Sequence, residues 1–402
     1  MAIQAEKAKP EDFDEAVDFI NYVFSFSHRP HNFPVMLPKI YLPGHFKDSI
    51  HYIIREQGKI KALVCAYPVD MVFNNKTQRT VLGGRGIGMV SVHPYCRSRG
   101  YMKILMTAAL DDMRRDGMVF SCLGGQRQRY EYFGFTPAGT AYSFRCERAN
   151  VIHTLGRQWK TSLSLKKVYA DDVKLLDQIF SMHCAGNFRI NRSRDKFFSV
   201  LTTWEAEVFS VFNGNFFLGY FIYRADKDCS RITELNINDY TRLPEVIGLI
   251  LMRQEELGQN DFTVITAGPH EREKIAFLSD FAENYSQTHA TQFAVLDFVR
   301  LADAFLSCSA VSGQTCSDTD SFIIKIEDTN SENGETIRLF GGKSSGGAEK
   351  TGEKPDIALS RREVVHFLFS PLAAQTFPVI HENKFLHSIL PLPLFIANAD
   401  EV

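Results

Sequence analysis

One stretch of the chain, V-S-V-H-P-Y-C-R-S-R-G-Y-M-K-I-L-M from Val90 to Met106, carries residues that could bind phosphate groups. It is typical of a short strand, a turn and an amphipathic helix. The turn contains Arg97 and Arg99, and Gly100 lets the backbone approach a ligand closely. Free N–H groups in a first helical turn, the positive helix end and flanking arginines bind anions together. The stretch therefore predicts a pyrophosphate site, the alternative being an ordinary connection with solvated arginines.

The elements around this stretch have the order of an α/β domain, which we expect over residues 1–150. The predicted elements are a helix over 11–24, a hairpin over 50–73, a strand over 88–92, a helix over 101–116 and a strand over 118–123. The G-R-G-I-G run from Gly84 is interpreted as turn or bulge glycines that precede the strand.

A long stretch rich in proline and aromatic residues separates the first helix from the hairpin and ends near Gly44. Loops of this length inside a compact domain are usually functional, so we expect it to form a wall of a substrate pocket. The candidate lining residues are Phe24, Phe26, His28, His31 and Phe33.

The same order of elements recurs faintly over residues 151–290, which indicates a duplicated domain. Its predicted elements are a helix ending at Met182, a hairpin around Gly214, a strand over 232–237, a helix over 244–257 and a strand over 262–267. The second copy has no R-S-R-G turn, so we interpret it as degenerate.

Residues 291–402 have a different character and predict a third, smaller α/β domain. Strands are expected over 294–298, 321–327 and 337–340, helices over 299–306 and 360–369, and a turn-rich loop over 341–355. The last residues, I-L-P-L-P-L-F-I-A-N-A-D-E-V, are too apolar for a tail in solvent. We therefore expect the C-terminus to be buried in the protein.

Composition excludes several classes of function. The 402 residues include 45 basic and 47 acidic side chains, so no global field attracts the protein to nucleic acid or to an acidic membrane. No apolar run approaches the ~18 residues of a membrane span, and the charged N-terminus does not resemble a signal peptide. The eight cysteines include no C-x-x-C pair, which predicts reduced thiols and no metal site. We expect a cytoplasmic protein.

The turn resembles the acetyl-CoA motif of the GCN5-related N-acetyltransferase (GNAT) superfamily, Q/R-x-x-G-x-G/A before a helix. Arg97 and Gly100 match this motif, whereas Met102 departs from its last small position. The three-domain plan resembles the enhanced intracellular survival family of acetyltransferases, whose third domain is similar to sterol carrier proteins. The resemblance implies tandem acetyltransferase domains, the second degenerate, a sterol-carrier-like C-terminal domain and a homo-oligomer, in that family a hexamer.

The resemblance also implies acetyl-CoA as the cosubstrate and assigns residues to it. Val90, Ser91 and Val92 would offer backbone hydrogen bonds to the pantetheine arm and the acetyl carbonyl. The pyrophosphate would be held by the turn and the first helical turn, Arg97, Ser98, Arg99, Gly100, Tyr101, Met102 and Lys103. Gly125 and Gln126, after the next strand, would make a further contact.

Acetyl transfer to an amine requires a group that removes a proton from the ammonium and one that protonates the departing thiolate. By resemblance the acid is Tyr130, in R-Y-E-Y-F-G-F, with Tyr132 as the neighbour that could replace it. Many acetyltransferases use a glutamate near the central strand as the base, but residues 80–92 contain no carboxylate. The resemblance gives this role to the terminal carboxylate of Val402, and His93 is the rival base.

The sequence thus predicts an N-acetyltransferase that acts on a primary amine without a metal. The acceptor could be an aminoglycoside-like compound, a polyamine, a peptide or a lysine side chain. The alternative is a non-catalytic protein that binds acyl-CoA or a lipid with the same domains. Measured release of free thiol with an amine would distinguish the two.

Overall fold

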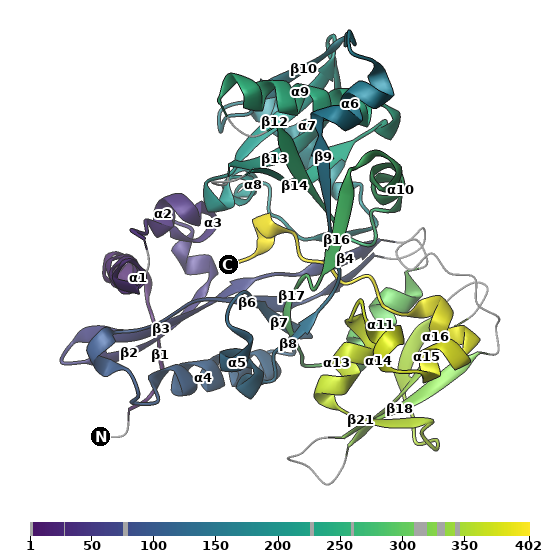
Figure 1. Cartoon of the computed structure of the whole chain (residues 1–402). Helices are drawn as coiled ribbons and strands as arrows, with labels where there is room; N and C mark the ends of the chain where they lie inside the picture. The colour runs from purple at the N-terminus through teal and green to yellow at the C-terminus, as the bar shows by residue number, and fades with distance from the viewer. Residues whose placement is uncertain are drawn as a thin grey trace.

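The computed structural model describes residues 3–27, 29–74, 79–225, 229–258, 261–308, 320–327, 334–341 and 346–402. The chain forms three lobes, two of them built on seven-stranded sheets and the third on a four-stranded sheet (Figure 1). Within the described residues, none of the helices has both the length and the hydrophobicity needed to span a lipid bilayer.

The sheet of the first lobe has the strand order β1-β2-β3-β6-β7-β17-β8. Its strands are β1 (Glu6–Lys7), β2 (Ile50–Glu56), β3 (Lys59–Pro68), β6 (Gly84–Val92), β7 (Phe120–Leu123), β17 (Thr291–Val295) and β8 (Thr136–Ala138). The pair β6–β7 is parallel and the other pairs are antiparallel.

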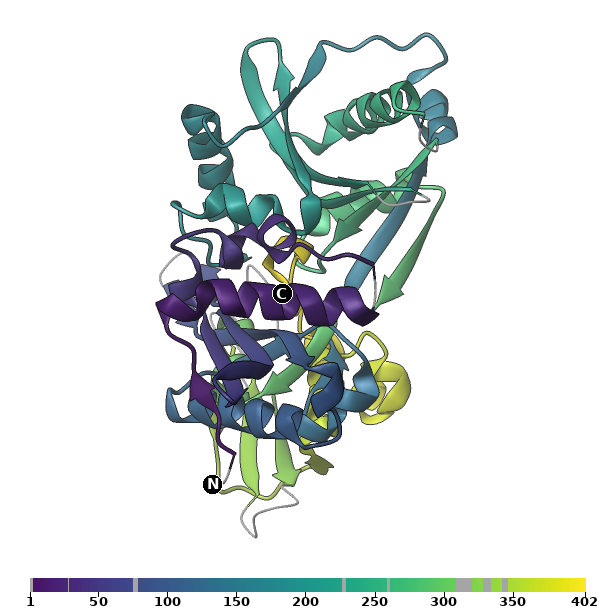
Figure 2. The same cartoon turned by 90° about the vertical axis from the view of Figure 1, so that its left-hand side faces the viewer.

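Two helices cover the faces of this sheet, α1 (Phe13–Ser27) on one side and α4 (Tyr101–Arg115) on the other (Figures 1 and 2). Successive residues of a strand point to opposite faces, so β3 contributes to both cores. Leu63 and Cys65 pack in the cluster under α1, whereas Ala62 and Val64 pack in the cluster under α4.

The second lobe repeats the first in its strand order, β10-β12-β13-β14-β15-β9-β16. Its strands are β10 (Leu163–Lys167), β12 (Glu207–Asn213), β13 (Phe216–Ala225), β14 (Ser230–Ile237), β15 (Phe262–Ala267), β9 (Ala141–Glu147) and β16 (Asn284–Thr288). The parallel pair, β14–β15, occupies the same place in the order as β6–β7. The topology therefore agrees with the duplication inferred from the sequence.

The helices of the second lobe are α6 (Arg148–Leu155), α7 (Val173–Cys184), α8 (Phe197–Leu201), α9 (Leu243–Glu256) and α10 (Arg272–Phe281). Together with the strands of the second sheet, these helices form one mixed α/β lobe, as expected for residues 151–290. The predicted elements over 170–182, 232–237, 244–257 and 262–267 correspond to α7, β14, α9 and β15.

The two large sheets exchange one strand each. β9 follows β8 in the chain but joins the second sheet, and β17 follows β16 but lies between β7 and β8 in the first sheet. These strands cross the limits expected at residues 150 and 290. The exchange is invisible to local sequence patterns because a strand has the same periodicity in either sheet. The division into 1–150, 151–290 and 291–402 stays a prediction.

The third lobe has a four-stranded sheet in the order β20-β19-β18-β21. Its strands are β18 (Ser321–Glu327), β19 (Glu335–Phe340), β20 (Gly347–Lys350) and β21 (Ile357–Ser360). Its helices are α11 (Phe298–Ser307), α13 (Arg361–Phe369), α14 (Ala373–Thr376), α15 (Val379–Glu382) and α16 (Lys384–Ile389). β20 lies inside the stretch 341–355 that was predicted as a loop, and residues 342–345 of that loop lie outside the described residues.

Two predictions for the first lobe were wrong. The stretch before Gly44 contains the short helices α2 (Phe33–Met36) and α3 (Pro38–Tyr41), each with a proline in its first turn, where a missing N–H costs nothing. The predicted hairpin over 50–73 ends with β3 at Pro68. The residues that follow form a separate strand, β4 (Met71–Asn74), which pairs with β5 (Arg79–Leu82) and with β11 (Phe188–Ile190) of the second lobe.

The C-terminal tail is buried, as its apolar composition predicts. Leu392, Leu394 and Ile396 lie in the hydrophobic core that the first lobe shares with the third. The tail then leaves this lobe and ends in the centre of the molecule (Figure 1). On the way, the Leu394 carbonyl accepts a hydrogen bond of 3.0 Å from the Thr140 N–H, and Phe395 packs against Gly268.

Candidate active site

Strand β6 continues past its parallel neighbour. Its pairing with β7 runs from Gly84 to Ile87, where β7 ends, while β6 continues to Val92. Its register with β3 shifts opposite Met89, whose φ of +49° marks a bulge. The sheet therefore opens at residues 88–92, and the edge of β6 that faces the opening can pair with an extended ligand. The predicted acetyl-binding residues Val90, Ser91 and Val92 lie there.

The turn after β6 brings the predicted phosphate-binding residues to the start of α4. Arg97, Ser98, Arg99 and Gly100 are all exposed, and Ser98 and Gly100 adopt left-handed conformations with φ of 63° and 79°. The first amide to bond within α4 is that of Ile104, which donates to the Gly100 carbonyl over 3.1 Å. The amides of 101–103 thus have no partner inside the helix and can donate to an anion.

The side chains of the first helical turn have other contacts. Tyr101 is buried and its hydroxyl donates to Glu56, which also pairs with Arg99 over 3.2 Å. Met102 packs against the core under α4, and the Lys103 ammonium lies 5.1 Å from the centre of the Tyr132 ring. Tyr101 and Met102 can therefore contribute main-chain amides rather than side chains to the predicted site.

We expect Gly100→Asp to weaken CoA binding about 100-fold or more, because the new carboxylate would repel the pyrophosphate. A Cβ atom at position 100 meets nothing within 4 Å, so there is room for the side chain. Gly100→Asn is the matched control, since asparagine has the same shape, tolerates the left-handed conformation and carries no charge. Calorimetric titration with CoA measures both. Equal affinities for the two variants would contradict an anion site here.

Tyr130 ends the short helix α5 (Arg127–Tyr130), which follows β7. It is 9% exposed, packs edge-on against Phe135, and lies on Gly125 so closely that a Cβ there would be 2.6 Å from its ring. The Gly125 carbonyl accepts a hydrogen bond of 2.5 Å from Gln292 of β17. Burial raises the pKa of Tyr130, opposed by Arg129, so the hydroxyl keeps its proton at neutral pH.

The neighbouring Tyr132, unlike Tyr130, has an exposed side chain. It is 69% exposed and lines a cavity of about 940 Å³ between the first and third lobes. Lys103, Arg114 and Arg362 line the same cavity. Tyr130 is thus the inward-facing member of the two, packed with the core under α4. Gln126, at the start of α5, is exposed.

The C-terminus lies against β6. A Cβ atom at Gly88 would be 3.0 Å from the carboxyl carbon of Val402, and one at Gly86 would be 2.9 Å from Val402 Cγ2. The run that contains these glycines was interpreted as turn or bulge residues, with the strand beginning at Gly88. Both lie within β6, where they leave room for the tail. Val402 packs in the cluster under α1 and Tyr130 in the cluster under α4, so the two lie on opposite faces of the sheet.

The rival base, His93, lies just beyond β6. Its Nδ1 accepts a hydrogen bond of 3.4 Å from the Tyr95 N–H, and its ring lies between Tyr22 and Tyr95 at centroid distances of 5.6 and 5.7 Å. Burial lowers the pKa of His93, and the positive charge of Lys61 adds to this. The ring therefore tends to be neutral.

The predicted lining residues of the substrate pocket lie in different environments. Phe24, His31 and Phe33 form one aromatic cluster with centroid distances of 5.0 to 5.5 Å, and Phe33 is buried in the core under α1. Phe26 is 61% exposed and packs against Tyr22. His28 lies outside the described residues. The role of these residues as a pocket wall stays a prediction.

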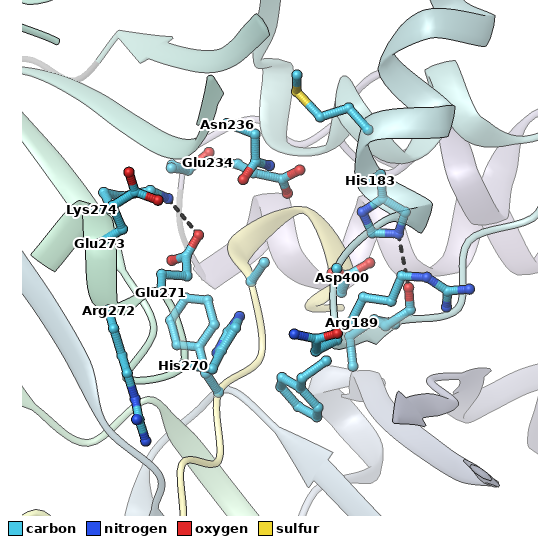
Figure 3. A pocket seen from close by; sticks show the side chains of 18 of the residues that line it. His183, Arg189, Glu234, Asn236, His270, Glu271, Arg272, Glu273, Lys274 and Asp400 are labelled. Atoms are coloured by element: carbon cyan, nitrogen blue, oxygen red, sulfur yellow. Dashed lines mark hydrogen bonds and ion pairs between the residues drawn. The ribbon is translucent and has the colours of Figure 1, made fainter. Parts of the chain in front are cut away.

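Sequence reasoning missed a cavity of about 430 Å³ between the second lobe and the tail. Figure 3 shows Asp400 of the tail, Glu234 of β14 and His270 around it. Lys39 of α3 also reaches the tail, through the carbonyls of Ala399 and Glu401. These residues come from four distant parts of the chain, and no local motif connects them.

In the part of the chain that the structure describes, no three His, Cys, Asp or Glu side chains are grouped so that they could hold a metal ion. None of the seven described cysteines forms a disulfide, and five of them are buried.

Comparisons with known proteins bear on the first lobe and on the overall fold. Residues 4–138 match the family model described as an acetyltransferase (GNAT) domain, and no curated protein matches the chain.

Solved structures share the fold over almost the whole chain. A conserved protein from Enterococcus faecalis V583 is 14% identical with a TM-score of 0.68, and the match covers 98% of both chains. A GCN5-related N-acetyltransferase from Kribbella flavida is 13% identical, with a TM-score of 0.64 and coverage of 98% of this chain and 97% of that one. Eis1 from Mycobacterium abscessus is 12% identical, with a TM-score of 0.59 and coverage of 98% and 96%. Residues 4–138 are thus a GNAT acetyltransferase domain, and the protein is an acyltransferase.

Proposed function

We propose that the protein transfers the acetyl group of acetyl-CoA to a primary amine, with the Val402 carboxylate as general base and Tyr130 as general acid. The observation that carries this proposal is the contact between the Val402 carboxyl carbon and Gly88, at the opening between β6 and β7. A carboxylate at this place replaces the acidic side chain that β6 lacks.

The open edge of β6 and the start of α4 are the parts suited to binding the cosubstrate. Main-chain groups of Val90 and Val92 would bond the pantetheine arm as an added strand would. The amides of 101–103, with Arg97 and Arg99, would hold the pyrophosphate. These contacts would direct the thioester toward the opening of the sheet, between Tyr130 on the α4 face and Val402 on the α1 face.

The proton balance of the transfer assigns one step to each catalytic group. The Val402 carboxylate takes a proton from the acceptor ammonium, directly or through one water, and the free amine then attacks the thioester carbonyl. The C–N bond forms, the C–S bond breaks, and the Tyr130 hydroxyl protonates the departing thiolate. The tyrosinate then takes the second proton from the newly acylated nitrogen, and Val402 releases its proton to solvent, so the site returns to its starting state and one proton is released per transfer.

The finer assignments follow from the same proposal. The chain shares its fold with Eis1 over almost its whole length. Membership of the enhanced intracellular survival family, a sterol-carrier-like third lobe and a homo-oligomer are proposed from the resemblance of the sequence. Aminoglycosides, polyamines and lysine-containing peptides are the acceptor classes that fit a primary amine. Light scattering of the purified protein tests the hexamer expected by resemblance.

Thiol release from acetyl-CoA tests the proposed function across a panel of aminoglycosides, polyamines and lysine peptides. We expect amine-dependent thiol release with at least one acceptor class and formation of the acetylated amine in equal amount by mass spectrometry. Tyr130→Phe is the matched control for chemistry that occurs without the enzyme. Tight binding of acetyl-CoA without thiol release for any amine would instead favour a non-catalytic acyl-CoA-binding protein.

A further inference from the structure

A buried arginine of the second lobe binds the C-terminal tail. Arg192, whose side chain is 2% exposed, donates from Nε to Asp400 Oδ1 over 2.9 Å and from Nη2 to Asp400 Oδ2 over 2.8 Å. Such two-point contacts fix both the position and the orientation of a carboxylate. Asp400 precedes Val402 by two residues, so this contact fixes the backbone within about 7 Å of the C-terminus.

Glu234 of β14 holds the same guanidinium from the other side. Arg192 donates from Nη1 to Glu234 Oε1 over 3.1 Å and from Nη2 to Glu234 Oε2 over 2.7 Å. The Tyr220 hydroxyl of β13 also donates to Glu234, and it accepts a hydrogen bond of 3.1 Å from Asn236. Burial opposes the charge of Glu234, but Arg192 lowers its pKa to about 2. Arg192 is therefore held by a charged group anchored on the second sheet.

Lys39 of α3 binds the tail from the first lobe. It is fully buried, and its ammonium donates to the carbonyls of Ala399 over 2.7 Å and Glu401 over 2.5 Å, on either side of Asp400. Burial lowers the pKa of Lys39 to about 7, although Asp400 opposes this. A neutral amine still has two N–H donors, so both bonds survive the loss of the proton.

Arg192 is paired with two carboxylates, Glu234 and Asp400. Lys39 adds a second positive charge beside them when it is protonated. Ion pairs in a protein interior are retained when each charge is paired and hydrogen-bonded, and removal of one partner leaves a buried charge uncompensated. The tail thus supplies one of the two carboxylates that pair with the buried Arg192.

The position of Glu234 in the fold is informative. β14 lies between β13 and β15 as β6 lies between β3 and β7. β6, which borders the opening in the first sheet, therefore corresponds to β14 in the second sheet, and β14 carries Glu234. The cavity in Figure 3 lies beside this contact, with Asp400 and Glu234 on its wall.

We propose that the second lobe is a dock that positions the C-terminal carboxylate over β6, with Arg192, backed by Glu234, as its positioning residue. This inference rests on the proposed role of Val402 as the base. In this proposal Arg192 contacts neither the open edge of β6, where the cosubstrate would bind, nor Val402. It acts through its contact with Asp400.

Asp400→Asn tests the dock because it removes one of the two carboxylates that pair with Arg192 and leaves the other, Glu234, in place. We expect hydrogen exchange of the peptide 396–402 to become about 10-fold faster and kcat to fall about 10-fold or more, with the KM for acetyl-CoA unchanged. Arg192→Lys keeps the charge but loses the two-point geometry and should act in the same direction. The double variant should be no worse than the more impaired single variant, because both act on one contact.

Asp177→Asn is the matched control. Asp177 pairs with Arg194 over 2.7 Å in the same lobe, but its side chain is 59% exposed, so its loss should change neither tail exchange nor kcat. Unchanged tail exchange in both Asp400→Asn and Arg192→Lys would overturn the dock. Faster tail exchange with unchanged kcat would support the dock and contradict Val402 as the base, so the two failures are distinguishable.

Discussion

Extension of the chain by Gly-Ser after Val402 is expected to reduce kcat at least about 100-fold, with little change in the KM for acetyl-CoA. Two added residues move the terminal carboxylate by up to about 7 Å. Strand β6 leaves no room for this displacement, because Val402 already lies so close to Gly86 and Gly88 that neither position could hold a Cβ atom. Steady-state rates with a responsive amine measure the effect.

Two further forms of the protein separate the effect of the terminal charge from the effect of added residues. A chain with a C-terminal amide, made by protein ligation, keeps the volume of Val402 and loses only its basicity, so it should be as impaired as the extended chain. The same Gly-Ser addition at the N-terminus should have no effect. Full activity of the extended chain, combined with loss in His93→Ala, would transfer the role of base to His93.

Replacement of Tyr130 by phenylalanine should lower kcat about 100-fold and leave acetyl-CoA affinity nearly unchanged. The ring is buried against Gly125 and Phe135, so phenylalanine fills the same space and removes only the hydroxyl. An acid is active below its pKa, and burial raises the pKa of Tyr130 above its usual value of 10. The wild-type rate should therefore show no loss from this group up to about pH 10.

Tyr132→Phe is the control for this prediction, since it changes the same atom two residues along the chain. Tyr132 is exposed on the cavity beside the third lobe, so its loss should change kcat less than about threefold. The reverse pattern of effects would show that the acid is Tyr132. Stopped-flow measurement of thiol release with both variants decides between them.

Sequence reasoning was effective where the site is local in the chain. The strand, turn and helix from Val90 to Met106 lie within a single run, and their caps and periodicity are intrinsic to it. Local composition also predicted the buried tail, whereas Tyr130 was assigned by the family resemblance and its role stays a prediction. The same kind of signal failed for residues 33–41, where hydrophobic packing turned a proline-rich stretch into helices.

The contacts that hold the tail could not be found in this way. Arg192 and Asp400 are separated by 208 positions, and Lys39 and Glu401 by 362. A single arginine or lysine in a sequence is far more often a solvated surface residue than a buried partner, so no residue type reveals these pairs. Only the packing of three lobes around one tail brings the charges together.

The exchange of β9 and β17 sets the order in which the molecule can be completed during synthesis. In the described sheet β17 lies between β7 and β8, so the first sheet stays open until residue 295 has emerged from the ribosome. The second sheet has all its strands once β16, which ends at Thr288, is made. Domains generally fold from the N-terminus as they are synthesised. Here the acyltransferase domain comes first in the sequence, yet its sheet is the later of the two large sheets to close, and nascent chains should show this order when stalled before and after residue 295.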